Sequence, residues 1–203
     1  MRAIWTRLAP GIAALALALA SGAANADCDF LTGGGFIIIH SNNGDAKANF
    51  GVGGGCKNGS PTWGHLEYID HGMDVKVHGT SITGYSKEGT DGTDSQGQPT
   101  GTRFICGTAR TNQSYGDVNF VVRARDTGEP GVTDEFDIQL TTGGTVAQGG
   151  VIVYSTTTPL FLTHHQLNDG NGGGGNIQLH LPNPSTTGTF SDPLVCPGLT
   201  APA

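Results

Sequence analysis

The chain has 203 residues, of which 34 are glycine and 10 are proline, and only 13% are charged. Glycine and proline at this density interrupt helices repeatedly, so the composition excludes a helix-rich protein. The glycines do not recur at every third position, which excludes collagen, and the length fits one ordinary domain.

The first 26 residues have the pattern of a secretory signal peptide. Arg2 and Arg7 form a basic start, residues 11–20 are apolar, and Ala24-Asn25-Ala26 is a small-x-small cleavage site. The apolar run is shorter than the roughly 20 residues that cross a bilayer, and no second run follows, which argues against a membrane span. We therefore expect a secreted protein, located outside the cell, on its surface or in the periplasm.

Cleavage after residue 26 removes two arginines and no acid, which leaves 8 basic and 17 acidic side chains. So acidic a protein is a poor match for nucleic acid or anionic lipid, both of which need clustered Lys and Arg. Divalent cations remain candidate partners. We expect residues 27–197 to form one domain and residues 198–203 a short flexible tail.

Alternating apolar and polar residues predict about nine short β-strands. In the clearest four, the side chains predicted to point inward are Met73, Val75, Val77; Val118, Phe120, Val122, Ala124; Phe136, Ile138, Leu140; and Ile177, Leu179, Leu181. The residues between them, including Glu135, Asp137 and Gln139, are predicted to face water. Shorter apolar runs lie at residues 36–40, 48–52, 65–69, 103–109 and 151–155. The pattern predicts an all-β, predominantly antiparallel two-sheet sandwich of the jelly-roll or Ig-like kind, with a closed barrel as the alternative.

Two stretches are predicted to be loops. Residues 86–102 are polar and rich in Gly, Asp and Gln, which is typical of an exposed hairpin tip. Residues 156–175 contain Leu160, Phe161 and Leu162, which we expect to tuck under the edge of the sheet rather than to form a binding patch.

Four cysteines follow the cleavage site, and an even number in an oxidising compartment predicts two disulfides. Of the three possible pairings we favour Cys28–Cys196, which would join the two ends of the domain, with Cys56–Cys106. A four-thiolate zinc site is disfavoured because no Cys-x-x-Cys pair is present.

Five carboxylates lie within twelve residues around Pro130-Gly131. Such a cluster needs a cation or hydrogen-bond donors to relieve its repulsion, and oxygen ligands suit Ca²⁺. The candidate Ca²⁺ ligands are Asp126, Glu129, Asp134 and Asp137. The alternative, which we favour, is a hairpin turn in which Asp126 and Asp134 accept backbone N–H bonds and a nearby arginine balances the charge.

The seven histidines show no metal-binding or catalytic spacing. His65, Glu67 and His71 are close in sequence, with Asp70 nearby, but ordinary surface positions are the favoured interpretation. No Gly-x-Ser-x-Gly motif is present, and one turn is a poor place for the two separated carboxylates of a glycosidase. The sequence therefore leaves enzyme activity uncertain, favours its absence and requires no cofactor.

Trp63 follows Pro61 and is the only aromatic side chain in a clear loop, which makes it a candidate for stacking on a sugar. A single loop tryptophan is more often part of the hydrophobic packing, and we favour that interpretation.

Several segments, in this order, resemble post-COAP domains, which are bacterial extracellular modules often found beside choice-of-anchor domains. They are residues 33–37, 48–51, 64–70, 77–82, 126–131 with Asp134 and Phe136, and 174–180. The resemblance covers residues 28–181 and implies a β-rich secreted or surface module with no established catalytic residues. The four cysteines and a separate signal peptide depart from that pattern.

These features predict a secreted, non-enzymatic β-sandwich module that acts in surface, matrix or adhesion contacts and is a candidate for Ca²⁺ stabilisation. Its partner would be an unidentified extracellular protein or glycan. The alternatives are a carbohydrate-binding module centred on Trp63 and a small hydrolase whose triad, assembled from loops, uses His71 or His164.

Overall fold

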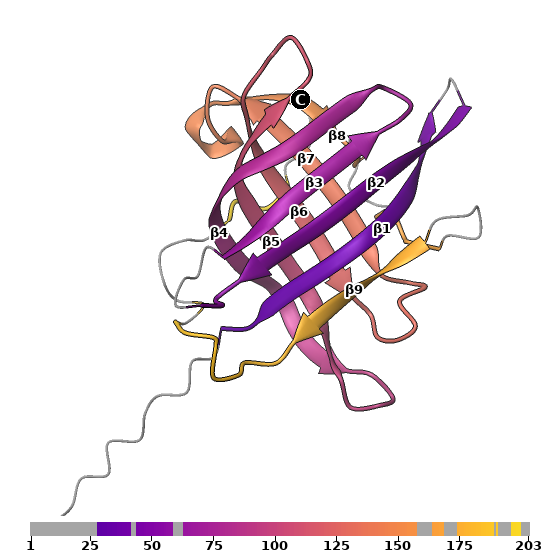
Figure 1. Ribbon diagram of the computed structural model, residues 1–203, viewed down its shortest axis with the longest axis vertical. Helices are drawn as coiled ribbons and strands as arrows, with labels where there is room; N and C mark the ends of the chain where they lie inside the picture. Colours follow the sequence, from indigo (N-terminus) through magenta and orange to yellow (C-terminus); the bar gives the residue numbers. More distant parts are fainter. Residues whose placement is uncertain are drawn as a thin grey trace, which may run out of the picture.

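The computed structural model describes residues 28–41, 44–58, 63–157, 164–168, 174–188, 190 and 196–199. The predicted signal peptide and residues 160–162 lie outside the described residues. Nine strands are present (Figure 1): β1 (Phe30–Ser41), β2 (Gly44–Gly55), β3 (Trp63–Asp70), β4 (Val75–Thr93), β5 (Pro99–Thr111), β6 (Val118–Asp126), β7 (Glu135–Thr142), β8 (Val151–Ser155) and β9 (Gly174–His180).

The strands form one antiparallel sheet in the order β8-β7-β6-β5-β4-β3-β2-β1-β9. The first eight follow one another as hairpins, and β9 returns to pair with β1 from Phe30↔His180 to Phe36↔Gly174. Each predicted strand overlaps one observed strand, so the all-β antiparallel class is confirmed. Among the described residues the only helix is the 3₁₀ turn Val146–Gln148, and no helix there could cross a membrane.

The sheet curls so that its inner face encloses the core, with β9, β1, β2 and β3 in front of β5, β6 and β7 in Figure 1. The ring of Phe50 on β2 stacks on that of Phe136 on β7 with centroids 3.9 Å apart. Alternate residues of each strand point into this core, including Leu31, Ile105 and Ile138, which are fully buried. Burial of these side chains supplies the main drive for folding.

Residues 86–102 form the exposed end of the β4–β5 hairpin, as predicted, but most of them are strand and not loop. β4 continues to Thr93 and β5 begins at Pro99, so the turn spans only residues 94–98. Side chains 87–90 are exposed on both faces, and a strand without a buried face lacks the apolar alternation by which strands are recognised.

Two strand ends were also misplaced. Met73 and Leu181, predicted to point inward, are 66% and 63% exposed because β4 begins only at Val75 and β9 ends at His180.

The polar side chains of β7 do not face water as predicted. Glu135, Asp137 and Gln139 are 8%, 0% and 2% exposed. Arg123 and Arg125 lie against Glu135, and His164 and His165 lie against Asp137. Pro197 and Gly198 lie beside Gln139. Alternation in the sequence separates apolar from polar faces, but it does not reveal that a later segment covers the polar face.

All four cysteines are in disulfides, but the predicted pairing was wrong: the bonds are Cys28–Cys56 and Cys106–Cys196. Cys28 and Cys56 come together because Phe30 pairs with Gly55 at the open end of the β1–β2 hairpin. Cys106 points to the outer face of β5, where it packs with Cys196 and Val121.

Candidate functional site

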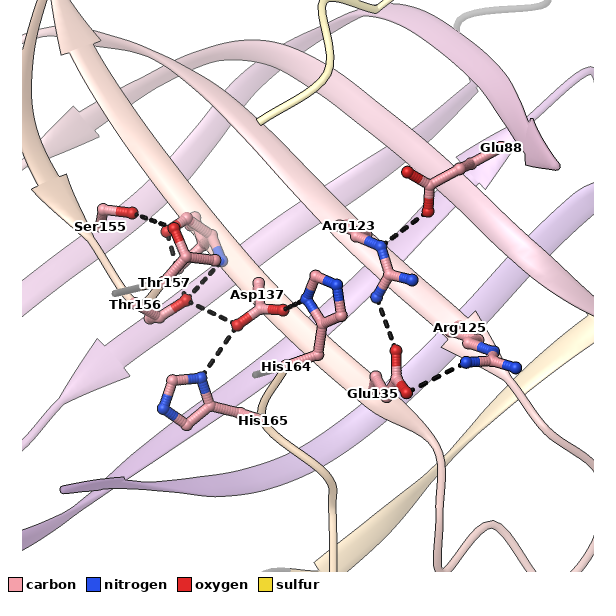
Figure 2. Close-up of polar contacts among 11 residues, drawn as sticks. Glu88, Arg123, Arg125, Glu135, Asp137, Ser155, Thr156, Thr157, His164 and His165 are labelled. Carbon is pink, nitrogen blue, oxygen red and sulfur yellow. Dashed lines mark hydrogen bonds and ion pairs between the residues drawn. The ribbon is translucent and has the colours of Figure 1, made fainter. Parts of the chain in front are cut away.

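A buried carboxylate on β7 holds two adjacent histidines. The Asp137 Oδ2 lies 2.6 Å from Nδ1 of His164, and Oδ1 lies 2.9 Å from Nδ1 of His165. The hydroxyl of Thr156, just after β8, donates to Oδ1 at 3.2 Å. Figure 2 shows the two imidazoles approaching the carboxylate from different sides. This Asp137 cluster joins three segments of the chain.

Backbone pairing fixes the histidines in place. The N–H of Phe136 donates to the carbonyl of His165 at 2.9 Å, and the N–H of Leu167 donates to the carbonyl of Asp134 at 2.8 Å. The side chain of Leu167 is fully buried in the core. Residues 164–168 therefore form a single antiparallel β-bridge with β7, which points both imidazoles at Asp137.

The cluster favours an ionised carboxylate. Burial acts to raise the pKa of Asp137, but hydrogen bonds from His164 and His165 outweigh it and hold the pKa below its usual range. A carboxylate only accepts hydrogen bonds, so the Nδ1 of each imidazole carries the proton that is donated to Asp137.

This geometry can orient a general base. The His164 side chain is 26% exposed, so part of this imidazole is in contact with water. Within the part of the chain that the structure describes, no Ser or Thr hydroxyl is hydrogen-bonded to either imidazole. The described residues thus provide an Asp–His pair and no hydroxyl nucleophile in contact with it.

A chain of ion pairs lies beside this cluster on the outer face (Figure 2). Arg123 donates to Glu88 at 2.8 Å and to Glu135 at 2.6 Å, and Arg125 donates to Glu135 at 3.2 Å. Burial acts to lower the pKa of Arg123, but its hydrogen bonds to Glu135 and Glu88 outweigh this and raise it. These contacts neutralise charge on β4, β6 and β7.

The acidic turn between β6 and β7 caps the outer edge of β9. Asp126 Oδ2 accepts the N–H of Leu179 at 2.7 Å, and Asp134 Oδ2 accepts the N–H of Ile177 at 2.8 Å. Their second oxygens accept N–H bonds within the turn, from Gly128 and Thr127 respectively. The two carboxylates occupy the places that carbonyls of a neighbouring strand would take. We call this arrangement the carboxylate clasp.

The four predicted Ca²⁺ ligands are not gathered around one point. Asp126 and Asp134 form the clasp, Glu129 accepts from the side-chain amide of Asn176 at 3.0 Å, and Asp137 holds the histidines. No group of three or more His, Cys, Asp or Glu side chains suited to a metal ion occurs among the described residues. The contacts match the alternative interpretation of capped N–H groups, and Ca²⁺ binding stays a prediction.

The remaining sequence candidates are spread over the sheet. Trp63 is half-buried at the start of β3, with its ring edge-on to Phe30 at 6.0 Å and the Nζ of Lys57 5.1 Å from its centroid. Glu67 pairs with His78, and His71 bonds to Asn49. His65, Glu67 and His71 are therefore not brought together as one site.

Sequence reasoning missed an ion cluster inside the sheet. The guanidinium of Arg103 is fully buried and uses all five N–H groups: two on Asp29, two on Asp91 and one on the carbonyl of Thr102. Tyr85 also donates to Asp29, at 2.6 Å. Asp29 precedes β1 and Asp91 lies within the segment predicted as a loop, so no periodic signal linked them to Arg103.

A second missed network connects two tyrosines to a turn. The hydroxyls of Tyr68 and Tyr154 lie 2.5 Å apart, and that of Tyr154 donates to Asp70 at 2.8 Å. Burial raises the pKa of both phenols far above the usual value, so both stay protonated. The network fixes β3 against β8.

Comparison with protein families, curated proteins and solved structures finds no match to this chain. The resemblance to post-COAP domains therefore stays a prediction.

Proposed function

We propose that this protein is a secreted, non-enzymatic β module that makes surface, matrix or adhesion contacts. The observation that carries the proposal is the placement of the two disulfides. One fastens the first strand through Cys28–Cys56, and the other fastens the C-terminal segment to the middle of the sheet through Cys106–Cys196. A sheet cross-linked by two disulfides suits an oxidising extracellular setting.

The internal use of charge also supports the proposal. The buried Asp29, Arg103 and Asp134 each meet hydrogen-bond partners inside the fold. In an enzyme, some buried titratable groups are directed at a substrate cleft. Here the groups hold strands together, as expected of a scaffold.

The test compares binding with turnover. The oxidised protein spanning residues 27–203 is applied to panels of extracellular matrix proteins and glycans, and in parallel to a broad hydrolase screen with serine- and metal-directed inhibitors. We expect saturable binding to at least one panel member and no inhibitor-sensitive turnover. Turnover blocked by an inhibitor would contradict the proposal.

The glycan panel also tests the carbohydrate-binding alternative. Glycan binding that is lost in Trp63→Ala would assign Trp63 to a sugar site. Binding that survives this substitution would leave Trp63 as a packing residue.

The second candidate is a small hydrolase, which the Asp137–His164 pair specifically favours. His164 would take a proton from water, which then attacks an activated ester, while Asp137 stabilises the imidazolium. The test is hydrolysis of p-nitrophenyl acetate above the buffer rate. His164→Gln should abolish that excess, whereas His78→Gln, which removes an exposed imidazole elsewhere, should retain it. Hydrolysis at the buffer rate would eliminate the candidate.

A further inference from the structure

Five of the seven histidines lie on one outer surface of the sheet. The surface consists of the outward side chains of β9, β1, β2 and β3 together with residues 71–80, and we call it the histidine face. The alternation of the strands sets this side: Leu66, Tyr68 and Val77 point into the core, so their neighbours point outward. The five histidines are His40, His65, His71, His78 and His180.

Hydrogen bonds confirm that these imidazoles share the face. His40 lies 2.7 Å from Asp45, and His71 lies 2.9 Å from the Asn49 side chain on β2. His78 on β4 contacts Glu67 on β3. His180 on β9 stacks on Phe30 at 4.4 Å and lies 2.9 Å from the hydroxyl of Thr32, both on β1. His65 is exposed on β3.

The fixed charges of this face cancel, although the whole chain carries a net charge of -7. Its cationic side chains are Lys47, Lys57, Lys76 and, opposite His78 on β5, Arg110. Its carboxylates are Asp45, Glu67, Asp74 and Glu129, which accepts from the side-chain amide of Asn176 on β9. Four cations against four carboxylates leave no net fixed charge, and protonation of all five histidines would give the face five positive charges.

Imidazoles as a class change charge between about pH 5 and 8. Burial and the nearby Lys57 lower the pKa of His180, while Asp29 opposes them, so His180 is neutral until the more acidic part of this range. A face that gathers five imidazoles can therefore gain positive charge as the pH falls through this range.

In the middle of the histidine face the backbone is not covered by side chains. Gly34 on β1 and Gly51 on β2 are register partners that point outward between Asn176 and Glu67. Gly51 has no heavy atom within 4 Å of where a Cβ would lie, and Gly34 has only a backbone oxygen there. Neither has the left-handed φ that favours glycine. Packing and backbone conformation thus do not demand glycine, whereas close approach of a ligand to the backbone would.

We propose that the histidine face binds a carboxylate-bearing polysaccharide and that binding tightens as the pH falls. An extended acidic chain could cross the exposed backbone at Gly34 and Gly51, with the lysines and histidines of the face on either side of it. Thr32 and Asn49 offer hydroxyl and amide groups to sugar hydroxyls, and the half-buried ring of Trp63 lies near one end. Charge complementarity explains why this face, on an acidic protein, suits a polyanion. The inference deepens the proposed function by naming a class of partner.

The test measures binding of the oxidised 27–203 protein to polygalacturonate at about pH 5.5 and about pH 7.5. Neutral dextran and phosphatidylglycerol vesicles serve as comparison surfaces. If binding takes up about one proton, the affinity for polygalacturonate rises about tenfold per pH unit of acidification. The triple variant H65Q/H71Q/H78Q should lose most of that pH dependence, while Arg125→Gln, which removes an exposed cation on another face, should retain it.

Unchanged melting temperatures would show that the variants stay folded, as expected for exposed side chains. Equal binding at both pH values, no binding at either, or the same loss in Arg125→Gln would overturn the proposal. Acid-dependent binding to the vesicles but not to polygalacturonate would reassign the face to a lipid surface. Binding to a matrix protein at neutral pH with none to polygalacturonate would refute this inference while leaving the proposed function intact.

Discussion

Replacing Arg103 by methionine tests whether the buried ion cluster holds the sheet together. The substitution keeps an apolar stem of similar length but removes five N–H donors. It leaves the carboxylate of Asp29, which is 6% exposed, without its cation. Breaking a buried ion pair from one side costs about 3–5 kcal/mol, because the remaining charge has lost its solvation and its partner.

The assay is thermal unfolding of the oxidised protein at neutral pH. For a domain of this length each kcal/mol corresponds to about 2–4 °C, so Arg103→Met should lower the melting temperature by about 10 °C. Lys87→Met is the matched control, because Lys87 contacts the same Asp91 at 2.7 Å but is 36% exposed. An exposed pair contributes only about 0–1 kcal/mol, so this control should shift the melting temperature by a few degrees at most.

The double variant Asp29→Asn/Arg103→Met separates a lost charge pair from lost packing. Asparagine can keep the contact with Tyr85, and no unpaired ion remains at position 29. The double variant should therefore be more stable than the two single costs added together. A loss below about 1 kcal/mol in Arg103→Met, or strict additivity, would refute the reasoning.

Four further predictions concern the acidic side chains. Asp134→Ala should cost about 1–3 kcal/mol and speed amide exchange at Ile177, whereas Asp126→Ala should do so at Leu179; the opposite pattern would contradict the carboxylate clasp. Burial raises the pKa of both clasp carboxyls, although their backbone N–H bonds act in the opposite direction. Their contribution to the stability of the fold should therefore increase as the pH falls toward 4. Asp126→Asn should make the melting temperature rise less over this pH range. The pKa of Asp137 is instead lowered, so its contribution to the stability of the fold is present above about pH 4 and is lost as the pH falls through the folded-state pKa. Asp137→Asn should therefore have a lower melting temperature at pH 7 and a smaller loss of stability on acidification. The same loss on acidification in the variant and the parent protein would count against the Asp137 cluster. If Ca²⁺ binds, a free Ca²⁺ concentration of about 100 times the dissociation constant should stabilise the fold by about 2.7 kcal/mol, which raises the melting temperature by several degrees. A rise that Asp134→Asn abolishes would support the ion site, and equal melting temperatures in Ca²⁺ and in chelator would exclude it.

The sequence was sufficient for the strands that have one apolar face. Phe120 and Ile138 were placed inward because alternation with period two reflects which side of a strand is buried. It failed where burial has another source: Asp137 looked solvent-facing because residues 164–168, which cover it, lie far along the chain.

The candidate site was predictable only in part. The turn residues Asp126 and Asp134 were recognised as N–H acceptors, but their partners on β9 depend on how far the sheet curls. The disulfide pairing likewise depends on strand register. Pairing of β1 with β2 brings Cys28 next to Cys56, and the number and positions of the cysteines in the sequence do not reveal that register.

The separation of the paired cysteines implies an order of assembly for a chain that emerges from its N-terminus. Cys28 and Cys56 are 28 residues apart and belong to one hairpin, so their bond can form while most of the chain is still absent. Cys106 must wait for Cys196, 90 residues later, after every strand has emerged. During that interval β1 is held in its hairpin while its other edge stays open for β9. The Cys28–Cys56 bond thus keeps β1 in register with β2 until β9, the last strand, pairs with β1.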